Sequence, residues 1–283
     1  MMAQPTGVAS KSGIQLFTTG TPNGFKVSIL LEELKEAYGK DYSVKSIDIF
    51  DNDNKPQKQP WYTALNPNGR IPTIVDHDRG GFAVFETTAI LAYLTRHYDP
   101  DHKFSFPVDS DDYSVCEQWL AWNHGGLTPM QGQANFFLRF TPSPSDHQYA
   151  IQRYVGETER LYGVLNARLA NRDYIAGPGR GRYSIADMSM AGLADAARFS
   201  AIDLRRQFPH VQAWLDRLLA RPALRRGLAV PDGPLKFRNE VLERALNAED
   251  GDGEEEGVRR MVEEGDCVVR DAKERFGYVY SSP

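Results

Sequence analysis

The sequence predicts two domains, an α/β domain near the amino terminus and an all-α helical bundle after it. Strand-like and helix-like segments alternate through roughly residues 13–98, whereas helical periodicity alone follows Asp109. Ile71-Pro72 interrupts the strand-like segment 70–76 with a proline, which cannot donate a ladder hydrogen bond. We therefore expect domains at 13–98 and 110–230, a proline-containing linker between them, and a C-terminal extension at 231–283.

The first domain is expected to contain four strands and three helical segments. Apolar residues recur at helical spacing from Val27 to Tyr38 and again in Thr87–His97, and a short helical piece lies near 61–65. Strand-like patterns mark the segments 14–17, 42–49, 70–76 and 82–85. The resulting order, βαβ-α-ββα, is typical of a thioredoxin-like module.

Helical patterns also organise the rest of the chain. One apolar stripe runs from Ile151 to Leu169 and another from Val211 to Leu219. Ser184-Ile185-Ala186-Asp187 predicts a capping box at the start of a further helix. The acidic run between Glu249 and Glu256 predicts a solvated loop, and 258–276 predicts one last helix.

Composition and charge restrict the classes of function. The 283 residues carry a formal net charge of −5, which favours neither nucleic acid nor an anionic membrane as a partner. Two cysteines cannot form a disulfide framework, and the polar segment 1–13 lacks the apolar core of a signal peptide. No apolar run approaches the ~20 residues of a membrane span, and the six histidines lack metal-ligand spacing. We expect a cytoplasmic protein without a metal.

Ile71-Pro72 gives the first indication of a ligand. A cis peptide bond there reconciles the proline with the strand pattern, at a cost of only ~0.5–1 kcal/mol. It would turn the N–H and C=O of Ile71 outward, toward a peptide-like ligand that docks as an extra strand.

Several segments together resemble the glutathione transferase superfamily. The thioredoxin-like start, Asn-Pro-Asn-Gly-Arg-Ile-Pro at 66–72, Phe-Glu-Thr at 85–87 and the capping box match that family over roughly residues 13–230. Thr-Pro-Asn-Gly at 21–24 and the segment 125–133 are similar to the nu class. That class includes bacterial disulfide-bond reductases and fungal transferases related to the yeast nitrogen-catabolite prion regulator. The resemblance implies the glutathione transferase fold, a thioredoxin-like α/β domain followed by an all-α helical bundle.

The resemblance implies a glutathione site in the first domain. Glu86 would hold the α-ammonium of the γ-glutamyl residue, and Thr87 would bind its α-carboxylate at a helix start. Ile71, with Pro72 fixing its geometry, would pair with the cysteinyl backbone. Arg70 and Gln57 resemble residues that reach the rest of the tripeptide. Simple helix capping by Glu86 and Thr87, and a solvated surface role for Arg70 and Gln57, are the alternatives.

Asn23 and Thr21 are the candidate catalytic residues. Thr21 and Gly24 stand where a thioredoxin has its two cysteines, so the reactive sulfur would come from glutathione. A free thiol with a pKa near ~8.5 is mostly protonated at neutral pH. The Asn23 amide, the Thr21 hydroxyl and the amino end of the following helix would favour the thiolate. A turn or N-cap role for Asn23 is the alternative.

The second domain would supply the contacts to the acceptor substrate. Five residues around the nu-like segment are candidates for that site: His124, Met130, Gln133, Asn135 and Phe136. Core packing is the alternative for the aromatic and methionine side chains, and a helix-end position is the alternative for His124.

The resemblance implies a transferase that conjugates glutathione to an electrophilic small molecule, in fungal secondary metabolism or detoxification. Glutathione-dependent disulfide reduction is the first alternative, because a bound thiolate can equally attack a disulfide sulfur. A glutathione-binding regulatory protein without turnover is the second. A homodimer is expected, because helices corresponding to 87–97 and 113–122 form the subunit interface of the family.

Overall fold

The computed structural model describes residues 12–247 and 253–277, which form two compact units. The first unit holds the chain up to Cys116 together with Tyr183–Gly192 and Leu219–Leu235. The second holds Glu117–Arg182, Leu193–Leu218 and the chain from Lys236 onward. The segments Tyr183–Gly192 and Leu219–Leu235 therefore pack with the amino-terminal part of the chain. The predicted domains are continuous in sequence, and their boundaries at 13–98, 110–230 and 231–283 stay a prediction.

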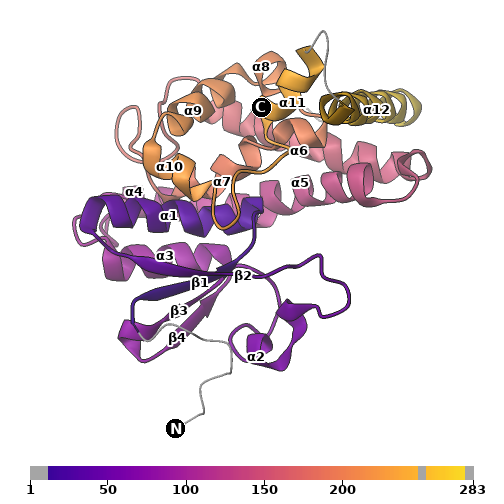
Figure 1. Ribbon diagram of the computed structural model, residues 1–283. Coiled ribbons are helices and arrows are strands. Elements are labelled where there is room, and N and C mark those ends of the chain that lie inside the picture. The colour runs from indigo at the N-terminus through magenta and orange to yellow at the C-terminus, as the bar shows by residue number, and fades with distance from the viewer. Residues whose placement is uncertain (1–11, 248–252, 278–283) are drawn as a thin grey trace. The chain divides into compact units, whose positions relative to one another are not determined.

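A four-stranded mixed sheet is the centre of the first unit (Figure 1). The strands are β1 (Ile14–Thr18), β2 (Tyr42–Ser46), β3 (Thr73–Asp76) and β4 (Phe82–Phe85), in the spatial order β2-β1-β3-β4. β1 pairs in parallel with β2, whereas β3 is antiparallel to both β1 and β4. The predicted fold class is therefore confirmed.

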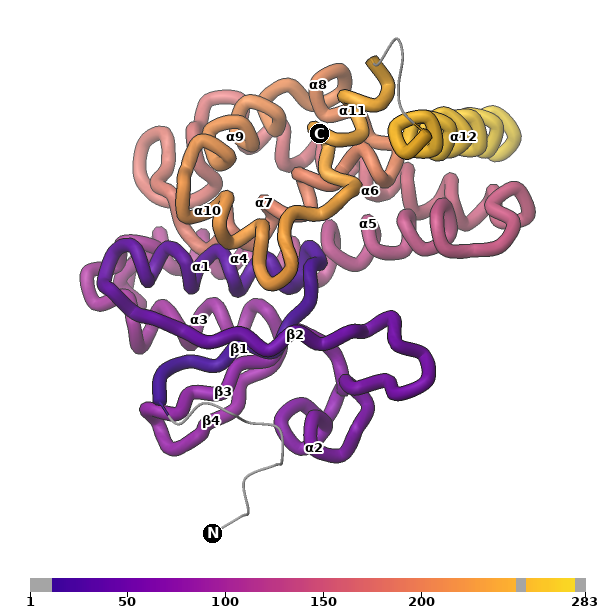
Figure 2. The backbone as a smooth tube through the Cα atoms, viewed as in Figure 1, coloured from indigo at the N-terminus to yellow at the C-terminus, as the bar shows by residue number. Residues whose placement is uncertain are grey.

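Helices cover this sheet. α1 (Pro22–Tyr38) and α3 (Thr87–Tyr98) lie side by side on it (Figures 1 and 2). The short α2 (Pro60–Thr63) belongs to a separate apolar cluster, in which Tyr62 and Leu65 pack against Phe17 and Val75 of the sheet. Successive strand residues point to opposite faces, so this cluster fills one face of the sheet with a core of its own.

α1 has well-defined signals at both ends. Thr21 is its N-cap, and the Thr21 hydroxyl accepts a hydrogen bond of 3.2 Å from the Gly24 N–H. Pro22 follows at the first helical position, where its missing N–H costs nothing. Gly39 ends the helix at φ 68°, a conformation that favours glycine. Residues local to α1 therefore fix where the helix begins and ends, and so where the residues at its amino end lie.

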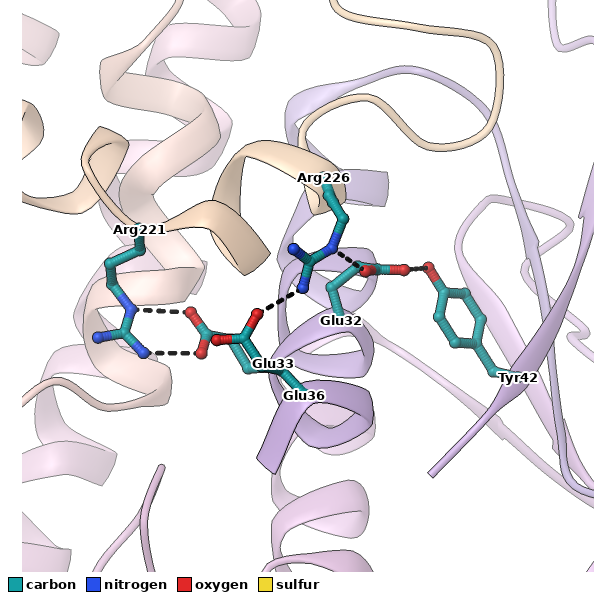
Figure 3. Close-up of polar contacts among 6 residues, drawn as sticks. All are labelled: Glu32, Glu33, Glu36, Tyr42, Arg221 and Arg226. Carbon is teal, nitrogen blue, oxygen red and sulfur yellow. Dashed lines mark hydrogen bonds and ion pairs between the residues drawn. The ribbon is translucent and has the colours of Figure 1, made fainter. Parts of the chain in front are cut away.

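α10 (Pro222–Gly227) packs on α1 within the first unit, although the two are far apart in sequence. Ion pairs join the two segments (Figure 3). Arg221 pairs with Glu33, and Arg226 pairs with both Glu32 and Glu36. The Tyr42 hydroxyl donates a further hydrogen bond to Glu32. Arg221 binds both carboxylate oxygens of Glu33, at 2.8 and 2.7 Å, and the Glu33 side chain is only 2% exposed. A bidentate pair to a buried carboxylate is the strongest kind of this contact.

Gly227 brings α10 into close contact with α1. The Ser28 hydroxyl donates a hydrogen bond of 2.7 Å to the Gly227 carbonyl, and both residues are buried. A Cβ atom on Gly227 would lie 2.5 Å from the Cα of Ile29 and 2.7 Å from its backbone nitrogen. Only glycine allows the two helices to approach this closely.

The second unit is helical. Its main helices are α5 (Thr128–Asn135), α6 (Gln148–Leu169), α8 (Leu204–Gln207), α9 (Pro209–Leu219), α11 (Asn239–Asn247) and α12 (Gly253–Phe276). α6 and α9 carry the two predicted apolar stripes, and α6 packs against both α5 and α12. π-helical turns at Asn123–Leu127 and Phe136–Phe140 flank α5.

α9 reaches the first unit with its last residue, Leu219, and two further helices contain residues of both units. They are α4 (Asp111–Trp122) and α7 (Ile185–Ala194). The predicted capping box precedes α7, where an Asp187 carboxylate oxygen accepts hydrogen bonds from the Ser184 N–H at 3.0 Å and from its hydroxyl at 3.2 Å. A carboxylate that reaches back in this way satisfies a donor at the helix start.

The acidic run differs from the predicted loop. Glu254, Glu255 and Glu256 form the first turn of α12, which begins five residues before the predicted helix at 258. The positive end of the helix dipole favours carboxylates in the first turn, so these three glutamates stabilise the start of α12. Glu249, Asp250 and Asp252 lie outside the described residues. Across residues 12–247 and 253–277, no helix is long and apolar enough to cross a bilayer.

Candidate functional site

Three chain segments meet at one edge of the sheet. Phe17 of β1 lies opposite Thr73 of β3, and Thr73 lies opposite Phe85 of β4. β1 and β4 therefore end where β3 begins. The residues after β1, before β3 and after β4 consequently share this edge, and they contain most of the predicted site: 19–24, 70–72 and 86–87.

The segment before β3 is held in place by buried polar groups. The Asn66 amide donates to the Arg70 carbonyl at 2.7 Å and to the Thr73 hydroxyl at 3.0 Å, and the Tyr62 hydroxyl donates to the same carbonyl at 2.8 Å. The two bonds to the Arg70 carbonyl occupy a backbone group that a longer strand would use for pairing. β3 therefore begins at Thr73, and the predicted strand 70–76 was too long at its start.

Ile71 presents its backbone at this edge. The Ile71–Pro72 peptide bond is cis. Within the described part of the chain, neither the N–H nor the C=O of Ile71 has a hydrogen-bond partner. Arg70 beside it is exposed, and its guanidinium has no ion-pair partner in the same residues. The edge thus offers an extended ligand two backbone groups and one cation.

Gln57 lies against the same segment. Gly69 has φ +61°, and a Cβ there would lie 2.8 Å from the Gln57 carbonyl oxygen. The Gln57 side-chain Oε1 is buried and has no hydrogen-bond partner. Lys58 donates to the Asn68 carbonyl at 3.2 Å, which brings a second cation near Arg70. Sequence reasoning missed Lys58, and its place directly after Gln57 was the available signal.

Glu86 and Thr87 lie at the amino end of α3. Glu86 has φ +68°, and its side chain makes no capping hydrogen bond to the helix. Its exposed carboxylate instead accepts a long hydrogen bond of 3.4 Å from the Asn68 amide. The Thr87 hydroxyl has no partner in the described chain, and the first N–H groups of a helix have none within it. Capping alone therefore does not explain Glu86.

Thr21 and Asn23 lie at the amino end of α1. Thr21 accepts from Gly24, so its hydroxyl proton remains available for donation. Asn23 is half-buried in the first turn, and its amide has no partner in the residues that the structure describes. The N-cap role considered for Asn23 is wrong, because Thr21 occupies that position.

Lys26 is a residue that sequence reasoning missed. It follows Asn23 by one helical turn, and its side chain is only 2% exposed. Burial lowers the pKa of Lys26 to about 7, while the nearby Glu86 carboxylate raises it. The signal was its spacing, because Lys26 lies four residues before Leu30 on the apolar stripe of α1.

Two models of protein families match the chain. The glutathione S-transferase N-terminal domain matches residues 21–97, and the glutathione S-transferase C-terminal domain matches residues 128–222. The chain belongs to the glutathione S-transferase family.

Individual relatives agree with this assignment. Glutathione S-transferase 2 of Schizosaccharomyces pombe is 36% identical over 73% of this chain and 90% of its own. Disulfide-bond oxidoreductase YfcG of Escherichia coli is 36% identical over 74% and 92%. The solved structure of the yeast prion protein Ure2p in complex with glutathione is similar at TM-score 0.69 and 29% identity, over 78% of this chain and 96% of that one. The predicted relation to the yeast regulator is confirmed.

The acceptor-site candidates of this glutathione S-transferase family member lie in its second unit. Met130 and Asn135 are half-buried on α5, and Asn135 accepts a 2.6 Å hydrogen bond from the Ser200 hydroxyl. The remaining candidates are exposed on α5 and the adjoining π-turns: His124, Gln133 and Phe136. The bond to Ser200 gives Asn135 a structural role, and an acceptor site formed by these residues stays a prediction.

Proposed function

We propose that the protein is a glutathione-dependent transferase, which binds glutathione at the edge of the sheet and uses its thiolate to attack an electrophilic small molecule. One observation carries this proposal. The Ile71 backbone, the Thr87 hydroxyl and the Asn23 amide, all without partners in the described chain, lie on three segments that share that edge. Polar groups left open in this way can form hydrogen bonds with a bound ligand.

The chemistry of the tripeptide fits these groups. Glu86 supplies a carboxylate for the α-ammonium of the γ-glutamyl residue. Thr87 and the amino end of α3 bind its α-carboxylate, where the helix dipole favours an anion. Ile71 pairs with the backbone of the cysteinyl residue as a strand would. Arg70 and Gln57 reach the glycine end, where a guanidinium suits a carboxylate.

The bound thiol is activated by hydrogen bonds and by the helix dipole. Asn23 and Thr21 donate to the sulfur at the amino end of α1, and each such donor stabilises the thiolate over the thiol. The thiolate then forms a carbon–sulfur bond to the electrophile, whose electron pair leaves with a departing group or takes up a proton from water. Neither cysteine of the chain enters this step, because Thr21 and Gly24 occupy the positions of a redox pair.

Disulfide reduction at the same site is the second candidate. The similarity to a protein named as a disulfide-bond oxidoreductase favours it. The thiolate would attack one sulfur of a disulfide and release the other as a thiol, and a second glutathione would resolve the mixed disulfide as oxidised glutathione. Binding without turnover, as a regulatory protein, is the remaining alternative.

We further propose a cytoplasmic homodimer that uses α3 and α4, and an acceptor of the kind formed in fungal secondary metabolism or detoxification.

Retention on immobilised glutathione tests the ligand. Wild-type protein is expected to bind the resin and to elute with free glutathione. Glu86→Gln removes the charge that pairs with the ligand ammonium, which is worth about 1.5–3 kcal/mol for a charge-assisted bond. We expect glutathione to bind this variant about 10- to 100-fold more weakly in isothermal titration calorimetry. Glu263→Gln, an exposed position on α12, is the matched control. Folded wild-type protein that passes through the resin would refute the site.

A further inference from the structure

Asn66 is a buried residue without a function in the mechanism above. It is only 2% exposed. Its amide donates to the Arg70 carbonyl at 2.7 Å and to the Thr73 hydroxyl at 3.0 Å, and its Oδ1 accepts from the Asn68 N–H at 3.0 Å. A carbonyl only accepts and an N–H only donates, so these partners fix which way the amide points. Both ends of the Asn66 side chain therefore hold the chain on either side of Ile71.

Tyr62 completes this network. Its hydroxyl donates to the Arg70 carbonyl at 2.8 Å and lies 3.0 Å from the Thr73 hydroxyl. Since the Tyr62 proton goes to the carbonyl, the Thr73 hydroxyl donates to Tyr62 while it accepts from Asn66. Burial raises the pKa of Tyr62 to about 12, which keeps this phenol a neutral donor near neutral pH. Each of the three side chains is thus bonded within one network, and such a network is rigid.

The network holds the peptide unit that carries the Ile71 N–H. The Arg70 carbonyl and the Ile71 N–H belong to one planar trans unit, in which they point in opposite directions. Asn66 and Tyr62, both buried, bind the carbonyl. The N–H, which has no partner in the part of the chain that the structure describes, is therefore directed away from them. Two donors on the carbonyl also polarise the unit, so the N–H becomes a stronger donor.

We propose that Asn66 is a positioning residue for glutathione, which together with Tyr62 orients the Ile71 N–H toward the cysteinyl carbonyl of the ligand and so sets the affinity without touching it. The inference rests on the proposed function, because it takes Ile71 as the residue that pairs with the ligand backbone. Without these bonds the segment would sample several orientations, and only a fraction of the molecules would be ready to bind. The apparent affinity falls by that fraction.

The groups that would activate the thiol do not depend on this network. Thr21 and Asn23 lie at the amino end of α1, where the Thr21 hydroxyl and carbonyl accept from Gly24 and Phe25. No hydrogen bond between described residues joins Thr21 or Asn23 to Asn66. Loss of the Asn66 side chain is therefore expected to weaken glutathione binding and to leave the chemistry of the bound thiolate unchanged.

Titration calorimetry with glutathione and steady-state kinetics with a model electrophile test this role. Asn66→Ala is expected to bind glutathione about tenfold more weakly, a loss of the size that one buried hydrogen bond can produce. Its KM for glutathione should rise by a similar factor, whereas kcat and the pKa of the bound thiol should stay those of the wild type. Tyr62→Phe keeps the ring in the core and removes one of the two donors, so a smaller loss of about threefold is expected.

Tyr38→Phe is the matched control, because it removes a hydroxyl that donates to Asp99 at 2.6 Å from the last residue of α1. It should leave the glutathione affinity unchanged, and an equal loss there overturns this inference. Folded Asn66→Ala that binds as the wild type does, or that loses kcat at an unchanged KM, also overturns it and leaves the proposed function intact. If Asn66→Ala does not fold, wild-type affinity in Tyr62→Phe overturns it. Absence of any binding by folded wild-type protein overturns both proposals.

Discussion

Replacing Asn23 with alanine is expected to lower turnover at least about tenfold, with both a model electrophile and a mixed disulfide. The Asn23 amide is half-buried at the amino end of α1 and has no partner in the described residues, so it is free to donate to the ligand sulfur. Loss of one aimed donor raises the barrier by about 1.4 kcal/mol or more. Both reactions begin with the same thiolate, so both are expected to slow.

The pKa of the bound thiol provides the decisive measurement. Ultraviolet absorbance of the thiolate, followed against pH in the glutathione complex, is expected to show a pKa about one unit higher in the variant. Asn171→Ala, at an exposed position of the second unit, is the control and should change neither quantity. Glutathione affinity should change little, because Glu86, Thr87 and Ile71 still hold the ligand. Unchanged rates in both assays would remove Asn23 from the mechanism.

Gly227→Ala is expected to lower the free energy of unfolding by about 2–3 kcal/mol. The added methyl group would meet backbone atoms of Ile29 at 2.5 and 2.7 Å, and backbone cannot move aside as a flexible side chain can. α10 would have to shift away from α1, which also weakens the buried bond from Ser28 to the Gly227 carbonyl. Alanine gains up to ~1 kcal/mol in helix propensity, which offsets only part of this cost.

A second helical glycine provides the matched control. Gly132 lies inside α5, and a Cβ there would have no atom within 4 Å. Gly132→Ala is therefore expected to be neutral or stabilising by up to ~1 kcal/mol. Thermal and denaturant unfolding of both variants give the comparison. Equal effects of the two substitutions would contradict the close approach of α10 to α1.

Much of the fold was predictable because its signals are local. Periodicity located α1, α3, α6 and α9, and Ser184-Ile185-Ala186-Asp187 marked the start of α7. Segment ends were less predictable. The strand expected at 42–49 ends at Ser46, and the one expected from residue 70 begins at Thr73, because Asn66 and Tyr62 hold the Arg70 carbonyl. The start of β3 thus depends on side chains that lie outside the strand in the sequence.

The site shows the same division. Ile71, Glu86 and Thr87 were recognised from short segments whose spacing is typical of the family, and the Ile71 backbone and the Thr87 hydroxyl, which have no partner in the described residues, agree with a ligand. Lys26 was missed, because its spacing on the apolar stripe of α1 was the one signal, and a lysine at such a position can still reach solvent with its ammonium group. The Asn23 amide was predicted as a donor, with an N-cap role as the alternative. Only the structure showed that Thr21 is the N-cap and that Asn23 lies within the first turn.

The sequence by itself determined the family and the α/β and all-α division, because each depends on local periodicity or on short motifs. Tertiary structure alone decided that α10 packs on α1, that three separate segments share one edge of the sheet, and that Lys26 is buried. The reason is physical. Local propensity acts within a few residues, whereas burial, electrostatic coupling and steric approach depend on partners that only the folded chain brings together.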